Sequence, residues 1–389
     1  MQSTNEKWIQ YKMGNSNYYQ VKFFDQSNPE DYSCCFSQGV TQLIPFPHDG
    51  KSDPKMNSVS SLAFCSKVHR SSDKYARRKI ACAFWNGKVM IYDIYTKEAL
   101  FSQIEARKYA EISIKSQAPI THVEWIGEGE RLLISSFMPT VYYIDLDQKT
   151  GPLSPYLKEL FSLPENTGIQ APQGIIATYY RGNKLLSASY QGVIQFFKYS
   201  HDSLENPQLL HQVKASQSAQ YFHASLQQAG VIWQDGTLSI YIESVSCFQM
   251  GHTHPIAIVG STNGRCQVLA TNQGDGKNNF LDPATGNRSV EVYALNGLTV
   301  DRNDATRLYT IGQDGQCIEW NYQNRTKVKS IAVNCGELPL TAVALSSGIE
   351  NKLLAVAGGD DYSIPKDPSA SVFGQSKNEK ISVLHIQLI

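Results

Sequence analysis

The stretch that decides the fold is residues 291–322, EVYALNGLTVDRNDATRLYTIGQDGQCIEWNY. Three short apolar runs follow one another in it, at 292–300, 308–311 and 317–322. Asp314-Gly315 separates the last two runs, and Asp-Gly between apolar runs favours a tight hairpin because glycine accepts the positive φ that the turn requires. Two strands, a tight turn and a third strand that ends in an aromatic residue are typical of one propeller blade.

Weaker copies of this unit occur along most of the chain, with first strands expected at 59–64, 120–126, 174–180, 221–226, 247–250 and 340–345. Asn86-Gly87, Gln191-Gly192 and Asp235-Gly236 supply equivalent turns, and the last two glycines have the spacing of one blade, roughly 40–45 residues. Residues 88–94 are apolar on both faces, as strands of stacked blades must be. The sequence therefore predicts an all-β, seven-bladed WD-repeat β-propeller.

The ends of the chain suggest how the ring is completed. Residues 1–32 are polar with scattered aromatics and are predicted to form an N-terminal arm. The propeller is expected to occupy 33–389, with the alternating apolar segment 34–46 pairing with the last blade. The segment 154–162 is expected to be a short helical or irregular connection, and 67–79 and 272–290 are expected to be loops.

The amino-acid composition limits the classes of function that we expect. Among 389 residues, 35 basic side chains balance 35 acidic ones, so long-range attraction to nucleic acid is not built in. The eight cysteines form no CxxC pair and are expected to be free, buried thiols of a reducing compartment. The N-terminus lacks the apolar stretch of a signal peptide, which predicts a soluble intracellular protein without membrane insertion. GxSxG, P-loop and GxGxxG motifs are absent, and we expect no enzyme activity, cofactor or metal.

Two basic clusters are candidate binding sites. The first is the stretch 67–79, whose cations Lys67, Arg70, Lys74, Arg77, Arg78 and Lys79 face one acid, Asp73. It is suited to phosphates or an acidic peptide, and the alternative is a solvated loop. The second is 320–329, with Trp320 and Tyr322 beside Arg325, Lys327 and Lys329. Aromatics interleaved with cations suit single-stranded nucleic acid, and the alternative is that Trp320 packs between blades.

The chain resembles the GLEBS-motif-binding WD-repeat propellers, which comprise the messenger-RNA export factor of the nuclear pore and a spindle-checkpoint propeller. The resemblance is carried by 59–64 (VSSLAF), 84–86 (FWN), 260–265 (GSTNGR), 293–298 (YALNGL), 312–315 (GQDG) with Trp320, 325–327 (RTK) and 353–357 (LLAVA). It extends weakly from about 57 to 386. This chain differs from the family at residues 279–290, where the Phe-Lys-Cys-His-Arg run of the family is missing.

This resemblance implies a non-enzymatic scaffold that serves mRNA export at the nucleus and nuclear pore, with cytoplasmic exchange. The implied partner is an acidic GLEBS-like segment of an FG nucleoporin, held by Trp85 and Arg265, and an aromatic beside an arginine is a usual hot-spot pairing. A single-stranded RNA contact would fall on Trp320, Arg325, Lys327 and Lys329, and Arg70, Lys74, Arg77 and Arg78 are further nucleic-acid candidates. The alternatives are a spindle-checkpoint adaptor and a structural subunit of an unrelated large complex.

Overall fold

The computed structural model describes the strands of the chain and several of their connections. The described residues are 7–13, 17–23, 32–33, 42–45, 58–70, 75–97, 104–114, 119–126, 131–136, 140–146, 156–162, 175–181, 184–189, 193–200, 205–214, 245–250, 257–261, 266–269, 280–281, 295–301, 303–304, 306–321, 324, 326–335, 338–348, 352–359 and 383–389. Everything regular in these residues is β-strand, and the strands form antiparallel sheets. No helix in them is both long and apolar enough to cross a membrane.

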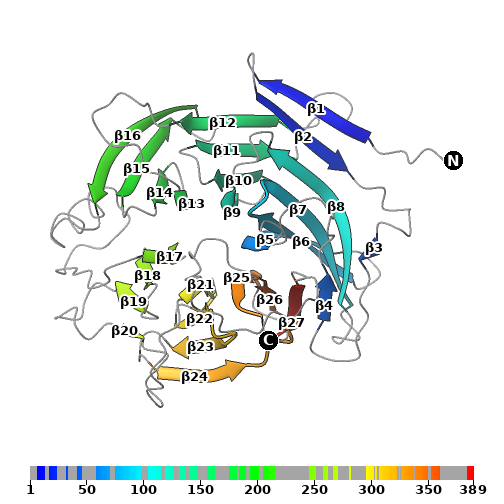
Figure 1. Cartoon of the computed structure of the whole chain (residues 1–389), viewed down its shortest axis with the longest axis vertical. Coiled ribbons are helices and arrows are strands. Elements are labelled where there is room, and N and C mark those ends of the chain that lie inside the picture. The colour runs from blue at the N-terminus through cyan, green and yellow to red at the C-terminus, as the bar shows by residue number, and fades with distance from the viewer. Residues whose placement is uncertain are drawn as a thin grey trace, which may run out of the picture.

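The first sheet contains the first predicted blade and the N-terminal segments. Its blade strands are β5 (Val59–Arg70), β6 (Tyr75–Phe84), β7 (Lys88–Lys97) and β8 (Ile104–Ile114). The hairpin of β1 (Lys7–Met13) and β2 (Asn17–Phe23) continues the sheet beyond β8, and β3 (Tyr32–Ser33) also pairs with β8. The N-terminal segment thus lies along the outer edge of this blade (Figure 1).

Four further sheets follow in chain order, each with four antiparallel strands. They are β9–β12 (Ile120–Ile126, Arg131–Ser136, Thr140–Asp145 and Tyr156–Ser162), β13–β16 (Ile175–Arg181, Lys184–Ser189, Val193–Ser200 and Glu205–Lys214), β17–β20 (Val245–Met250, Ala257–Ser261, Cys266–Leu269 and Phe280–Leu281) and β21–β24 (Leu295–Val300, Arg307–Gly312, Cys317–Asn321 and Thr326–Ile331). The predicted fourth repeat, 221–242, lies outside the described residues.

The last sheet joins the two ends of the chain. It consists of β25 (Leu340–Leu345), β26 (Leu353–Gly358), β27 (Val383–Leu388) and β4 (Gln42–Pro45). β4 pairs with β27 antiparallel, from Val383 opposite Pro45 to Ile386 opposite Gln42. The segment predicted to close the ring forms this fourth strand.

The sheets are arranged radially around a centre, with β5, β9, β13, β17, β21 and β25 innermost (Figure 1). This is the architecture of a β-propeller, and the all-β prediction is confirmed. The described residues supply six such sheets, and the count of seven blades stays a prediction. Two expectations were wrong, because 154–162 is largely strand β12 and most of 67–79 belongs to the β5–β6 hairpin.

Alternating side chains cover the first blade on both faces. Ile80, Cys82 and Tyr92 pack toward the last sheet, in one core with Ala344 and Leu353. Ala81, Ala83, Val89 and Ile91 pack toward the second sheet, in one core with Val123, Leu132 and Ile144. Because successive strand residues point to opposite faces, an uninterrupted apolar run is what a blade between two neighbours needs.

Tight turns and side-chain hydrogen bonds hold the blades in register. The predicted glycines Gly87 and Gly315 have φ of 81° and 74°, as the turns require. Between blades, the Trp125 indole N–H donates to the Ala63 carbonyl at 2.9 Å. The Asn296 amide donates to the Leu340 carbonyl at 2.8 Å. Adjacent blades are therefore joined by directional bonds as well as by apolar packing.

Gly358 is predicted to be intolerant of a side chain. A Cβ built there would lie 2.7 Å from the Cβ of Cys335, which is too close for any real contact. Gly358→Ala should lower the free energy of unfolding by about 1–3 kcal/mol, the usual cost of overpacking, as measured by urea denaturation. Gly297→Ala is the control, because its nearest neighbour is the movable end of Ile311 at 3.1 Å. An equal or larger loss in the control would contradict this steric explanation.

The buried His385 is predicted to make the protein less stable at acidic pH. Its ring is fully buried, and burial lowers the pKa of the imidazole below the usual 6.5, against the opposing effect of Gln387. Nδ1 accepts the Asn334 N–H at 3.0 Å, which fits the neutral ring. The unfolded chain then binds the proton more readily, so the free energy of unfolding should fall as the pH drops below about 6.5. His385→Asn keeps an acceptor and should flatten this part of the profile; an unchanged slope would exclude His385 as the source.

Candidate binding surfaces

Trp85 lies in the turn between β6 and β7. Its backbone N–H donates to the Ser58 carbonyl at 3.2 Å, and its side chain is buried. The neighbouring Asn86 accepts the Lys88 N–H at 3.1 Å, which fixes the turn. Arg265, the other residue of the predicted peptide site, lies outside the described residues. A joint site of Trp85 and Arg265 therefore stays a prediction.

Trp320 lies inside its blade rather than on the surface. Its indole N–H donates to the Thr310 hydroxyl at 2.8 Å, and the ring is buried. The adjacent outer strand β24 is exposed from Thr326 to Ser330, so Lys327 and Lys329 reach solvent. Arg325 lies outside the described residues. Within the described part, the predicted RNA patch thus offers cations, while its tryptophan belongs to the core.

The basic stretch 67–79 forms the end of the β5–β6 hairpin, and strand alternation divides its charges between two faces. Arg77 and Lys79 point to the face of the second sheet, whereas Arg70 and Arg78 point to the face of the last sheet. Lys74 lies outside the described residues. The run of cations that looks continuous in the sequence is therefore two separate groups on opposite faces of the blade.

The two cations of the first group, Arg77 and Lys79, share one buried carboxylate. Lys79 Nζ lies 3.0 Å from Asp93 Oδ1, and Arg77 Nη1 lies 3.8 Å from Asp93 Oδ2. The Lys79 ammonium also lies 3.8 Å from the centre of the Tyr109 ring, at a distance suited to a cation–π contact. Lys79 and Asp93 are almost completely buried, so this group serves the stability of the blade.

Two other blades repeat this arrangement at the same end of their strands. Arg131, opposite Asp145 on the next strand, forms an ion pair with it at 3.4 Å. In the sixth predicted repeat, the residue opposite Arg307 is Asn321, which carries no charge. The Arg307 guanidinium pairs with the Glu319 carboxylate, at 3.2 Å between Nη1 and Oε1. The sequence analysis missed this pattern. In these three blades, an acid near the end of the third strand, with a basic residue near the start of the second, was the available signal.

The carboxylates and cations of these pairs differ in their access to water. The side chains of Asp93, Asp145 and Glu319 are at most 2% exposed, whereas those of Arg77, Arg131 and Arg307 are between 34% and 51% exposed. Lys329 adds a further exposed cation 3.4 Å from Glu319. At this end of the blades, negative charge is inside and positive charge faces outward.

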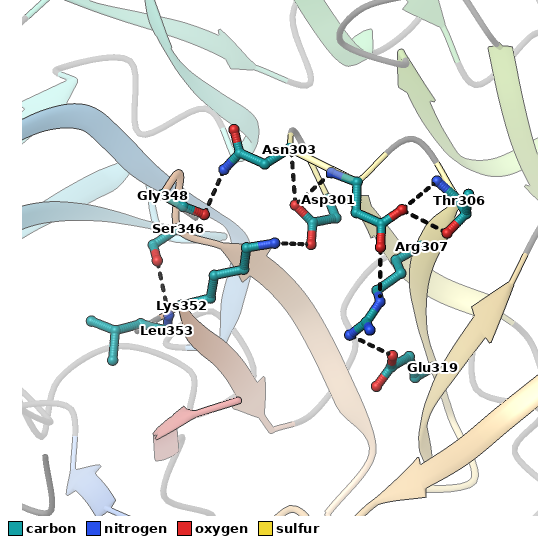
Figure 2. A network of polar contacts seen from close by, with 10 residues as sticks. Asp301, Asn303, Thr306, Arg307, Glu319, Ser346, Gly348, Lys352 and Leu353 are labelled. Atoms are coloured by element: carbon teal, nitrogen blue, oxygen red, sulfur yellow. Dashed lines mark hydrogen bonds and ion pairs between the residues drawn. The ribbon is translucent and has the colours of Figure 1, made fainter. Parts of the chain in front are cut away.

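A polar network continues from these pairs into the last blade (Figure 2). The buried Asp301 forms an ion pair with the partly buried Lys352 and accepts the N–H groups of Asn303 at 2.9 Å and Asp304 at 3.3 Å. Asp304 in turn accepts the Arg307 guanidinium at 3.0 Å. The chain of contacts joins the last blade to the blade of β21–β24 through alternating charges.

Asp304 is a partly exposed member of the network, and its carboxyl pKa is lowered by its neighbours. The Thr306 hydroxyl donates to its carboxylate at 2.6 Å, and this bond is the main cause of a lowered pKa, with smaller contributions from the Thr306 N–H and from the charges of Arg307 and Lys352. Burial, the second-largest influence, acts in the opposite direction. The loop 301–307 is therefore organised around carboxylate acceptors.

Arg78 is the exception to this pairing. Its residue is 5% exposed, and its Nε and Nη1 atoms have no hydrogen-bond partner. Burial lowers the pKa of the guanidinium, and the nearby charge of Arg70 lowers it further. In the part of the chain that the structure describes, no ion pair joins either arginine to a carboxylate.

No known protein-family model matches the chain, and no curated protein matches its sequence. Among solved structures, the β-propeller domain of Cps50 (Swd1) from Myceliophteria thermophila is similar with a TM-score of 0.44 and 10% sequence identity, over 84% of this chain and 82% of that one. The propeller architecture described above rests on the chain's own strand pairing and radial sheets.

The ion pair of the buried Asp301 with the partly buried Lys352 is predicted to be essential to the network. Asp301→Asn keeps an acceptor for the loop N–H groups but leaves the Lys352 ammonium without its counter-charge, so the free energy of unfolding should fall by about 3 kcal/mol. Asp304→Asn is the matched control in the same loop. Its side chain is 35% exposed, and the loss should stay below about 1 kcal/mol. Chemical denaturation measures the free energy of unfolding of both variants. Similar losses would contradict the explanation that the deeper burial of Asp301 makes its ion pair more important.

Proposed function

We propose that this protein is a non-enzymatic interaction scaffold that binds an acidic segment of a partner protein. The observation that carries the proposal is the outward display of Arg77, Arg131 and Arg307 over carboxylates that are buried beneath them. An acidic segment gains from such a surface because exposed charges steer association and fix orientation. The balanced net charge does not oppose this, since the exposed positive charge is local to one end of the blades.

The narrower form of the proposal follows from the family resemblance. In it, the partner is a GLEBS-like segment of an FG nucleoporin, and the protein acts in mRNA export at the nucleus and nuclear pore. The resemblance assigns Trp85 and Arg265 to this segment. Trp85 belongs to the β6–β7 turn, at the opposite end of the blade from Arg77, so the two forms of the proposal predict binding at opposite ends.

A second candidate is a fixed subunit of a larger assembly. The outer strand β24 favours it, because its side chains are exposed from Thr326 to Ser330 and Val328 is 54% exposed. An exposed edge strand with an apolar side chain can pair with a strand of a partner chain. Affinity purification of the tagged protein from its own cells distinguishes the candidates. A stable stoichiometric complex supports the fixed subunit, and recovery as an exchanging monomer counts against it.

Binding of an acidic peptide is predicted to depend on one end of the blades. The probe is a peptide of alternating Glu and Ser, and the affinity of the full chain is measured by calorimetry at several salt concentrations. Arg131→Gln and Arg307→Gln should each weaken binding about two- to five-fold, as expected for one partly exposed charge. Binding should also weaken as salt rises.

Lys88→Gln is the matched variant for the other end, since Lys88 follows the Trp85 turn and is 40% exposed. Arg265→Glu tests the second residue that the resemblance assigns to the acidic segment. If these two variants alone weaken binding, the acidic segment lies at the Trp85 turn and the narrower form is favoured. If the peptide does not bind, or if none of the four variants changes its affinity, the proposed function is wrong.

A further inference from the structure

The β5–β6 hairpin contains a charged group that its own blade does not neutralise. Arg78 lies opposite Val68 on β5 and opposite Ile94 on β7, between two apolar neighbours in the sheet. Its Nε and Nη1 atoms are buried without a hydrogen-bond partner. A buried guanidinium is costly unless an anion accepts its N–H groups, and removing the charge from such a site is often stabilising.

A second arginine lies on the same face. Arg70 stands opposite Ala76, two positions along the strand from Val68, so both guanidinium groups project toward the last sheet. Arg70 is exposed, whereas Arg78 is buried. The two positive charges are close enough to repel each other, so a single anionic group placed beside both would offset one exposed and one buried cation.

Neighbouring contacts hold this site in place. The Ser347 hydroxyl, beyond the end of β25, donates to the Ser66 carbonyl of β5 at 3.4 Å. On the other face of the hairpin, Lys79 is anchored to Asp93. The β5–β6 hairpin is thus held through Ser66 on β5 and through Lys79 on β6, which is the preorganisation that tight recognition of a small anion requires.

We propose that Arg78 and Arg70 form a docking site for a phosphorylated serine or threonine of a partner segment. The inference rests on the proposed function in that the partner is acidic, and it adds the group that is recognised. A phosphate monoester carries a charge of about −1.5 to −2 at neutral pH and can neutralise two arginines, whereas one carboxylate carries a single charge. The planar guanidinium fork also matches phosphate oxygens.

The burial of Arg78 favours a side-chain phosphate over a nucleic-acid backbone. A phosphate monoester is the terminal group of a thin side chain and can reach a mostly buried arginine. A backbone phosphate has a sugar on each side and is better suited to exposed cations such as Lys327 and Lys329. Arg78 is therefore assigned to a phosphopeptide.

The test uses three short peptides that differ at one central residue between alanines: phosphoserine, glutamate or serine. Their affinities for the full chain are measured by NMR titration or calorimetry. The phosphoserine peptide should bind roughly ten-fold more tightly than the glutamate peptide, as expected for an added charge-assisted contact. Arg78→Met and Arg70→Ala should abolish this preference, and Arg78→Lys, which keeps the charge but loses the fork, should reduce it.

Arg107→Met is the matched control, because it removes a partly exposed arginine of β8 that pairs with Glu105 and takes no part in the proposed sites, so it should leave the preference unchanged. Thermal unfolding provides the second measurement. Arg78→Met should raise the melting temperature without phosphate and remove the stabilisation that inorganic phosphate gives the wild-type protein. Arg70→Ala keeps the test decisive if Arg78 variants fold poorly, since Arg70 is exposed.

Three outcomes would overturn the inference. One is equal affinity for the phosphoserine and glutamate peptides. Another is a phosphoserine preference that survives both arginine variants. The third is a single-stranded oligouridylate whose binding, rather than that of the phosphopeptide, depends on Arg78. If the glutamate and phosphoserine peptides bind equally and the Arg131 and Arg307 variants weaken both, the proposed function stands while this inference fails.

Discussion

The structure depends on carboxylates that are buried near the ends of the blade strands. Asp93, Asp145, Glu319 and Asp301 lie in the interior, where an isolated charge is costly, so each is held by a cation. Because the acid lies inside, its partner must approach from the outer side, where a long basic side chain keeps part of itself in water. One requirement of stability therefore gives these blade ends an outward positive charge in a chain whose total charge is balanced.

Some of these charged side chains also connect neighbouring blades. Asp301 organises the loop after β21 through the N–H groups of Asn303 and Asp304, and its other oxygen binds Lys352 of the last blade. The Trp125 indole joins the second sheet to the first in a neutral version of this contact. These directional contacts act together with the interdigitated apolar packing of the interface to fix one blade against the next. A surface built from side chains of several blades depends on that arrangement.

The inner strands and the turns were predictable from sequence, and the outer strands were not. The strands that lie inside the outermost one of each blade, such as 353–358, are buried on both faces and appear as apolar runs, and Asn86-Gly87 and Asp314-Gly315 mark turns between such strands. The outer strand β24, TKVKSI, is exposed on most of its length and lacks such a run. The candidate tryptophans were chosen for their chemistry, but Trp85 and Trp320 are buried, because large aromatic side chains are most stable in the packed interior. The cross-strand ion pairs join residues such as Lys79 and Asp93 that only the register brings together.

Arg78 and Lys79 show how strand geometry gives adjacent cations different roles. In the sequence they belong to one basic run, ARRK, and their charges are equivalent. In the strand they point to opposite faces, so Lys79 meets Asp93 while Arg78 meets Val68 and Ile94. An apolar residue at position 78 would fit between these neighbours at a lower cost than an arginine without an anion. Proteins break such local rules mainly at functional or strained sites. Under the phosphopeptide proposal, the ligand supplies at Arg78 the anion that the blade itself does not.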